Sequence, residues 1–144
     1  MQNMLGEAIS ICANIFSNTT DKGGRPYFEH CHFVAEAGLD DEEKAAGYLH
    51  DVEEDTDITS ADLRESGMSE RVIHIVETLT KRDSETYKEY IKRVASDPDP
   101  GCVRLKKRDL EHNTMVSRLK NLSKKNLDKL EDYFWAYTYL KTIK

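Results

Sequence analysis

Apolar positions recur every three or four residues over most of this chain, the spacing that places side chains on one face of an α-helix. The clearest case follows Ser69, where Val72, Ile75, Val76 and Leu79 fall on one side. The strict alternation of polar and apolar residues that is typical of strands is nearly absent. The pattern therefore predicts an all-α protein, folded as an irregular helical bundle.

Turn formers and capping residues divide this pattern into helices. Two glycines interrupt it within residues 17–25, and the run DPDPG at residues 97–101 is the clearest loop. Asp40 or Asp41 can cap one helix, and Thr59 opens another with a box-like cap. The predicted helices cover residues 2–17, the segment from Pro26 onward, and residues 42–53, 59–66, 69–79, 85–96, 101–119 and 123–143.

The last predicted helix carries the longest apolar stripe. Its members are Leu127, Leu130, Phe134, Tyr137 and Leu140. Their spacing places all five on one helical face, so we expect the whole stripe to pack in the core.

Length, charge and cysteine content narrow the class of protein. The 144 residues favour one domain over residues 1–144, because domains usually contain about 100–200 residues. The net charge of −6 argues against a nucleic-acid partner, which usually needs a broad basic face. No apolar run approaches the roughly 20 residues of a membrane helix, and no secretory leader is apparent. Three cysteines without a Cys-x-x-Cys motif favour reduced thiols, and we expect a cytoplasmic protein.

Histidine and carboxylate side chains gather in residues 48–56, which read YLHDVEEDT. On a continuous helix Asp51 and Asp55 would share a face, and so would His50 and Glu54. Close carboxylates repel one another, and a bound cation would relieve that repulsion. A solvated acidic helix end accounts for this segment equally well, so both interpretations stand at this point.

Two further segments add groups of the same kind. Residues 21–30 end in His30, and within residues 105–113 Asp109 and Asn113 lie four positions apart on one helical face. Two imidazoles and two carboxylates from three helices would suit a divalent ion whose remaining positions are filled by water. The combination of the three segments is more specific than any one of them.

In this order the segments resemble the HD phosphohydrolase superfamily, and in particular the hydrolase domain of RelA/SpoT-type proteins and their small single-domain relatives. Residues 21–30, DKGGRPYFEH, are similar to K-x-G-x-P-Y-x-x-H. Residues 50–56, HDVEEDT, are similar to H-D-V-x-E-D-T, and residues 105–113, LKKRDLEHN, to V-K-L-A-D-x-x-x-N. The resemblance extends over about residues 5–120 and implies an HD-type helical bundle.

The resemblance also implies roles for individual residues. The metal of this family is usually manganese (Mn²⁺), and its implied ligands here are His30, His50, Asp51 and Asp109. Glu54 and Asp55 would be the catalytic acidic pair next to the metal. Asn113 would contact the sugar of a nucleotide, and Lys22 would lie at the guanine or phosphate end of the pocket.

Five more side chains are candidates for substrate contacts on their own chemistry. Lys81 and Arg82 follow the apolar helix that ends at Leu79 and could contact phosphate, and so could Lys106 and Lys107 beside Asp109. Surface charges are the alternative for all four lysine and arginine side chains. Tyr27 could line the pocket, or it could be a core tyrosine.

The chain departs from the family pattern at three places. Phe16 stands where many relatives have a histidine, and Asp21 stands where the long enzymes have an arginine. After Asn113 the chain reads Thr114-Met115-Val116 in place of M-R-T or M-D-L. The metal and catalytic positions are kept, whereas the positions that read the base are kept only in part.

The implied reaction removes the 3′-pyrophosphate of (p)ppGpp with metal-activated water and leaves GDP or GTP. Glu54 or Asp55 would orient the water or accept its proton. Two alternatives remain open. One is an HD phosphohydrolase for another nucleotide or phosphorylated metabolite, and the other is a non-catalytic nucleotide-binding HD module. The partner we expect is a small phosphorylated nucleotide, and the sequence leaves room for a homo-oligomer.

Overall fold

The computed structural model describes residues 3–119 and 121–143 of the chain. The predicted first helix begins at Gln2, and the predicted domain runs from Met1 to Lys144. Those end positions lie outside the described residues.

The described residues form helices and loops and contain no strand, so the predicted all-α fold is confirmed. One isolated antiparallel bridge joins Thr20 to Pro26. The helices are α1 (Met4–Ile15), α2 (Tyr27–Ala35), α3 (Asp41–Leu49), α4 (Val52–Asp55), α5 (Ser60–Glu65), α6 (Glu70–Leu79), α7 (Tyr87–Ser96), α8 (Pro100–Asn113), the 3₁₀ turn η1 (Val116–Arg118) and α9 (Lys124–Lys141).

Side-chain caps explain where several of these helices begin. Asp40 accepts the backbone N–H of Glu43 at 2.9 Å and starts α3. Thr59 and Asp62 form a reciprocal capping box at the start of α5, as the sequence predicts. Such a cap typically stabilises a helix by about 1 kcal/mol, so these short helices are defined locally as well as by packing.

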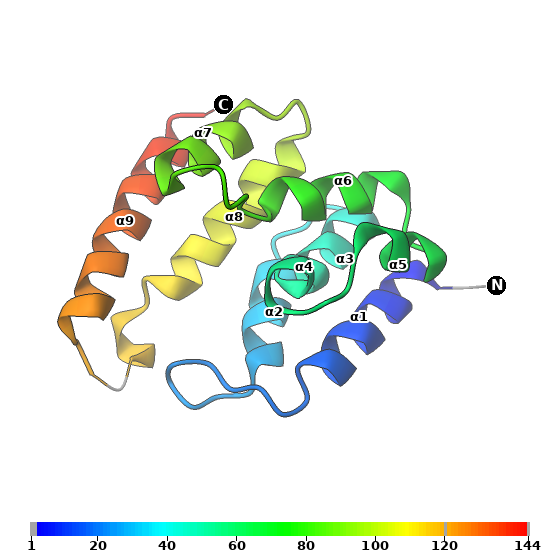
Figure 1. Cartoon of the computed structure of the whole chain (residues 1–144), viewed down its shortest axis with the longest axis horizontal. Coiled ribbons are helices and arrows are strands. Elements are labelled where there is room, and N and C mark those ends of the chain that lie inside the picture. The colour runs from blue at the N-terminus through cyan, green and yellow to red at the C-terminus, as the bar shows by residue number, and fades with distance from the viewer. Residues whose placement is uncertain (1–2, 120, 144) are drawn as a thin grey trace.

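Helix α3 lies at the centre of the N-terminal part of the bundle. It packs against α1, α2 and α6. Helix α8 packs against α2 on one side and α9 on the other, so that α9 and α7 lie at the far end of the molecule from α1 and α5 (Figure 1). Among the described residues, no helix combines the length and the apolar character needed to cross a membrane.

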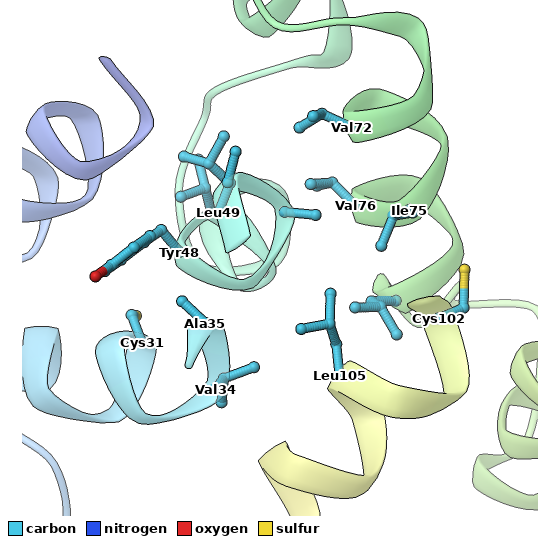
Figure 2. Close-up of a cluster of buried hydrophobic side chains, with 14 of the residues drawn as sticks. Cys31, Val34, Ala35, Tyr48, Leu49, Val72, Ile75, Val76, Cys102 and Leu105 are labelled. Carbon is cyan, nitrogen blue, oxygen red and sulfur yellow. The ribbon is translucent and has the colours of Figure 1, made fainter. Parts of the chain in front are cut away.

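Part of the core is formed by side chains from α2, α3, α6 and α8 (Figure 2). Leu49 of α3 is fully buried, and the residues drawn with it include Val34 of α2, Val72, Ile75 and Val76 of α6 and Leu105 of α8. Burying each of these side chains contributes about 1.5–3 kcal/mol. The core therefore anchors α2, α3 and α8, and three of the predicted metal ligands, His30, His50 and Asp109, lie on these helices or directly at their ends.

Gly47 allows α3 to approach α2 closely. A Cβ atom at this position would lie 2.6 Å from Cα of Ala35, well inside van der Waals contact. Backbone atoms cannot move aside as the end of a flexible side chain can. The close approach therefore requires glycine here, and it brings the C-terminal ends of α2 and α3 together.

The predicted helix over residues 42–53 is in fact two helices. Helix α3 ends at Leu49, and α4 begins at Val52. Between them Asp51 has φ −102° and ψ 0°, a conformation in which active-site residues are often found. On a straight helix, neighbouring side chains point about 100° apart. The bend instead turns His50 and Asp51 toward the same point.

The predicted helix over residues 101–119 is also shorter than expected. It ends at Asn113, and side chains form hydrogen bonds with its last carbonyl groups. The Thr114 hydroxyl donates to the carbonyl of Leu110 at 2.8 Å, and Arg118 donates to the carbonyl of His112 at 2.7 Å. The chain then turns through η1 toward α9.

The predicted apolar stripe of α9 is only partly buried. Leu130 and Leu140 pack in the core as expected, but Leu127 is 50% exposed and Phe134 is 54% exposed. The buried face runs through Ala136, which the pattern did not single out. Helix α9 lies at the edge of the bundle and packs mainly against α8 and α7, so it buries a narrower face than five apolar residues would cover.

Candidate metal centre and cleft

Four predicted ligands from three parts of the fold meet beside α8. His30 Nε2 lies 2.9 Å from Asp109 Oδ1, and His50 Nε2 lies 3.0 Å from Asp51 Oδ2 and 3.4 Å from Asp109 Oδ1. His30, His50 and Asp51 can each place one ligand atom within 4.8 Å of the other two. His30, His50 and Asp109 are almost completely buried. These groups are therefore close enough to one another to bind one ion.

The ring of His50 is oriented by the backbone. Its Nδ1 lies 2.6 Å from the carbonyl oxygen of Gly47, which can only accept, so Nδ1 carries the proton. Its Nε2 is buried and, despite the nearby carboxylates, has no partner in hydrogen-bond geometry. A bare, buried imidazole nitrogen beside two carboxylates is what a metal ligand requires. The residues present therefore fit a divalent ion.

Burial alone would favour the neutral form of every group in this cluster. At His50, however, the carboxylates of Asp51 and Asp109 outweigh burial and raise the pKa well above its ordinary value. At Asp109, burial is outweighed by the Lys106 ammonium and by both imidazoles, which hold the pKa well below its ordinary value. A divalent cation would replace the imidazole protons in such a cluster.

Asp51 and Asp109 are each held by a second group. The Tyr27 hydroxyl donates a short hydrogen bond to Oδ2 of Asp51. Lys106 Nζ donates to Oδ2 of Asp109 at 2.8 Å, and Asn113 Nδ2 donates to Oδ1 at 3.2 Å. Neither carboxylate can rotate freely, so the cluster is organised by the protein alone.

His30 is held by a residue that the sequence did not point to. Its Nδ1 lies 2.7 Å from Nδ1 of His112, and the two rings are stacked with their centroids 5.0 Å apart. Burial, Arg118 and His30 together lower the pKa of His112 to about 4. His112 is therefore a neutral imidazole at physiological pH.

A cleft of about 530 Å³ opens beside the cluster. The predicted site residues that line it are His30, Asp51, Asp109, Glu54, Asp55, Lys22, Tyr27, Lys81, Lys106 and Asn113. Arg82 is not among the lining residues, and its backbone N–H donates to Glu85 at 2.8 Å. The structure thus brings together every predicted site residue except Arg82 and Lys107, with His50 behind the wall of the cleft.

Comparison with known proteins shows the family of this chain. A family model described as HD domain matches residues 8–100. The chain belongs to the HD domain family. The match includes three of the four clustered groups, and Asp109 lies beyond it.

One curated relative and one solved structure extend the comparison. The guanosine-3′,5′-bis(diphosphate) 3′-pyrophosphohydrolase of Aquifex aeolicus is 38% identical over 89 residues, which are 54% of this chain and 13% of that protein. The chain thus spans 13% of the length of this relative. A solved structure, described as a metazoan ortholog of SpoT that hydrolyzes ppGpp, has a TM-score of 0.79 at 18% identity and covers 97% of this chain and 86% of that one. At this identity the likeness shows a shared HD fold.

The acidic pair of the HD domain lies on α4 at the open side of the cleft. Glu54 and Asp55 are exposed, whereas Asp51 just before them is half-buried. Partial desolvation and the charge of Asp51 raise the pKa of both carboxyl groups above their ordinary values. A carboxylate with a raised pKa is a better proton acceptor, which suits a group that takes a proton from water.

Asp21, where the HD domains of the long enzymes have an arginine, holds a loop together. Its Oδ1 accepts the backbone N–H groups of Gly23 at 2.9 Å and Arg25 at 3.0 Å, while its Oδ2 pairs with Arg118. Arg118 also lines the cleft. A guanidinium group is therefore present at this end of the cleft, but it comes from the segment after α8 and is paired with Asp21.

Sequence reasoning missed the part of the cleft wall that α7, α9 and the segment between α8 and α9 form. Its missed residues are Tyr87, Tyr90, Arg118, Leu119, Asn126, Lys129, Leu130 and Tyr133. Of the two lysines beside Asp109 that were candidate phosphate contacts, Lys106 lines the cleft and Lys107 does not. The residues of α9 carry no signal in the sequence, because only the packing of α9 on α8 brings them to the site.

A second pocket, with a larger volume of about 800 Å³, lies on the other side of α8. It is lined partly by Arg104, Lys107 and Arg108, which project from the face of α8 opposite Lys106 and Asp109. Lys107 is the one candidate phosphate contact among its lining residues, and none of the predicted metal or catalytic residues lines it. Volume alone therefore does not identify the candidate site. The cleft beside the histidine cluster is smaller, but it contains the groups that could bind a metal ion and accept a proton.

Proposed function

We propose that this HD domain is a metal-dependent phosphohydrolase that removes the 3′-pyrophosphate of (p)ppGpp. The observation that carries the proposal is the bare Nε2 of buried His50, surrounded by His30, Asp51 and Asp109 at the end of an open cleft. The Aquifex aeolicus relative, which is named for this reaction, supports the choice of substrate.

His30, His50, Asp51 and Asp109 would hold the ion, for which we propose Mn²⁺. Their donor set of two imidazole nitrogens and two carboxylates suits a borderline-to-hard divalent ion. When bound, such an ion supplies Lewis acidity, which makes water more acidic and offsets charge on phosphoryl oxygens.

The residues of the chain would supply the remaining functions. Glu54 or Asp55 would take the proton of the attacking water, which adds to the phosphorus attached to the ribose 3′ oxygen. The bond from that phosphorus to the 3′ oxygen breaks, pyrophosphate leaves, and the 3′ oxygen gains a proton.

Cations around the cleft fit an anionic substrate. Lys22, Lys81, Lys106, Lys129 and Arg118 line it. They balance the five carboxylates of the lining, so the cleft is close to neutral in a chain whose net charge is −6, and a bound divalent ion would make it positive. This local balance supports a small phosphorylated nucleotide as the ligand, whereas the acidic remainder of the surface would disfavour nucleic acid. We further propose that the reaction takes place in the cytoplasm, which is compatible with three free, buried thiols.

Asp21 supports a second candidate, a related phosphohydrolase for another nucleotide. Its carboxylate stands where the long enzymes have an arginine and pairs with Arg118. The end of the cleft that would receive a base therefore differs in its chemistry from theirs.

The test is hydrolysis by purified protein with Mn²⁺, with ppGpp, GTP, GDP and other nucleotides offered separately. We expect pyrophosphate and GDP from ppGpp, loss of this activity in Asp51→Asn, and full activity in Asp57→Asn, an exposed acid outside the cleft. Turnover of a different nucleotide, with none of ppGpp, would overturn the substrate. Binding of nucleotides without turnover of any would identify a non-catalytic module.

A further inference from the structure

His30 is contacted through both of its ring nitrogens, and one contact is unusual. Nε2 faces Asp109 and the metal cluster, whereas Nδ1 faces another imidazole nitrogen, Nδ1 of His112, at 2.7 Å. At this distance exactly one proton must lie between two nitrogens that form a hydrogen bond. The contact therefore defines the protonation of both rings together.

The metal role of His30 decides which ring holds the proton. A metal ligand needs a free lone pair on Nε2, so the proton of neutral His30 must be on Nδ1. His30 then donates and His112 Nδ1 accepts, which leaves the proton of His112 on its own Nε2. His50 is arranged in the same way, with the carbonyl of Gly47 as its acceptor.

We propose that His112 is a positioning residue, whose Nδ1 accepts the Nδ1–H of His30 and so keeps Nε2 of His30 bare and aimed at the metal. This inference rests on the proposed metal centre. It assigns His112 no contact with substrate, because His112 does not line the cleft.

The surroundings of His112 suit this role. Its ring stacks on Phe33 at 4.3 Å between centroids, and the Arg108 guanidinium lies 3.5 Å from the Phe33 ring on α2. The backbone carbonyl of His112 accepts from Arg118 at 2.7 Å. The acceptor is therefore held in place from both the ring side and the backbone side.

Two substitutions separate the hydrogen bond from simple packing. His112→Asn places an acceptor oxygen near the position of Nδ1 but removes the stacked ring, whereas His112→Phe keeps the stack and removes the acceptor. If His112 positions His30, we expect His112→Phe to weaken Mn²⁺ binding by about 10–100-fold, and His112→Asn to stay within about threefold of the wild type. Electron paramagnetic resonance titration of free Mn²⁺ measures both values.

A packing role predicts the reverse order. Equal affinities for the two variants, or tighter binding by His112→Phe, would overturn the proposal. His32→Phe is the matched control, because it removes a half-exposed imidazole from α2 that bonds Tyr48 and lies outside the cluster. Circular dichroism checks that each variant is folded.

A second measurement does not depend on any variant. Long-range ¹H–¹⁵N spectra of the protein loaded with diamagnetic Zn²⁺ report which nitrogen of His30 carries the proton. We expect the proton on Nδ1, and a proton on Nε2 would overturn the proposal. Neither readout involves a nucleotide, so failure of ppGpp hydrolysis and failure of this inference are separate results. A wild-type protein that binds no Mn²⁺ would contradict both.

Discussion

Glu54 and Asp55 follow Asp51 closely in sequence, yet the three carboxyl groups are placed for different work. Asp51 is turned toward two imidazoles and accepts a hydrogen bond from Tyr27. Glu54 and Asp55 lie in the cleft, and their pKa values are raised by desolvation and by Asp51. This difference in surroundings supports Asp51 as a metal ligand and Glu54 and Asp55 as candidate proton acceptors, although all three are acidic residues of one short segment.

We expect Glu54→Gln and Asp55→Asn to reveal the proton acceptor. Loss of a general base typically lowers the rate by about 10²–10⁴-fold, and the affected variant should show this fall in kcat with its Mn²⁺ affinity nearly unchanged. Steady-state kinetics with ppGpp and a metal titration measure the two quantities. Asp57→Asn is the control from the same acidic segment. Wild-type kcat in both variants would show that neither carboxylate has this role.

At the scale of helices, the approach of α3 to α2 sets the position of His50. Gly47 makes the approach possible, and its carbonyl also accepts from the His50 ring. One residue thus links the packing of two helices to the orientation of a metal ligand. Helix α9 has a different part: it contributes Lys129 and Tyr133 to the cleft while leaving Phe134 on its exposed face.

Gly47→Ala should destabilise the fold and weaken the metal site together. The added Cβ would meet backbone 2.6 Å away, and overpacking of this kind costs about 1–3 kcal/mol. The matched control is Gly6→Ala in α1, where the Cβ would be at least 3.4 Å from its neighbours. Because alanine favours helix over glycine, this control should be neutral or more stable by about 0.5–1 kcal/mol. Urea denaturation compares them, and equal free energies of unfolding would refute the close-approach argument.

At the scale of the whole molecule, a buried carboxylate connects α3 to α6 and α8. Glu43 is 2% exposed, and it accepts from Arg104 at 2.7 and 3.0 Å and from Arg71 at 3.0 Å. Arg71 also pairs with Asp40 and Asp99. Together with the continuous core, this network supports our proposal that the chain forms one domain.

The Glu43 network makes stability depend on pH in a defined direction. Hydrogen bonds from Arg104, which outweigh burial, and from Arg71 hold the pKa of Glu43 below its ordinary 4.5. A depressed pKa contributes stability that is present above pH 4.5 and is lost as the pH falls below it. We therefore expect Glu43→Gln to cost about 2 kcal/mol at pH 7 and progressively less below pH 4.5.

Urea denaturation between pH 7 and pH 3 measures this convergence. Asp41→Asn, at an exposed acid two residues away, is the control and should change stability by less than about 0.5 kcal/mol. A gap between wild type and Glu43→Gln that stays constant over the whole range would rule out the ionised Glu43 as its source.

Sequence pattern and motif predicted the class of fold and nearly all of one wall of the site. His30, His50, Asp51 and Asp109 could be named because their chemistry and order are specific. The bend at Asp51 could not be predicted in this way. The spacing of apolar residues indicates which face of a helix is buried, but it does not indicate where the direction of the helix axis changes. Phe134 shows the same limit, since spacing cannot tell whether an apolar face has a neighbour to pack on.

His112 and Tyr133 were missed for a tertiary reason. His112 lies in the motif-like segment of residues 105–113, but its partner His30 is far away along the chain and meets it only when α2 packs on α8. Tyr133 reaches the cleft only because α9 folds back along α8. Neither contact leaves a trace in local sequence.

The bend between α3 and α4 also has a consequence for loop-closure entropy. Because one peptide bond joins His50 to Asp51, holding these two together closes no loop, and an unfolded chain keeps them close as well. His30 and Asp109 reach them only through the docking of α2 and α8. The higher affinity of an ion for the folded chain than for the unfolded chain would therefore come mainly from the docking of these two helices. The adjacent residues His50 and Asp51 would contribute less to this difference, although they are the more recognisable half of the motif.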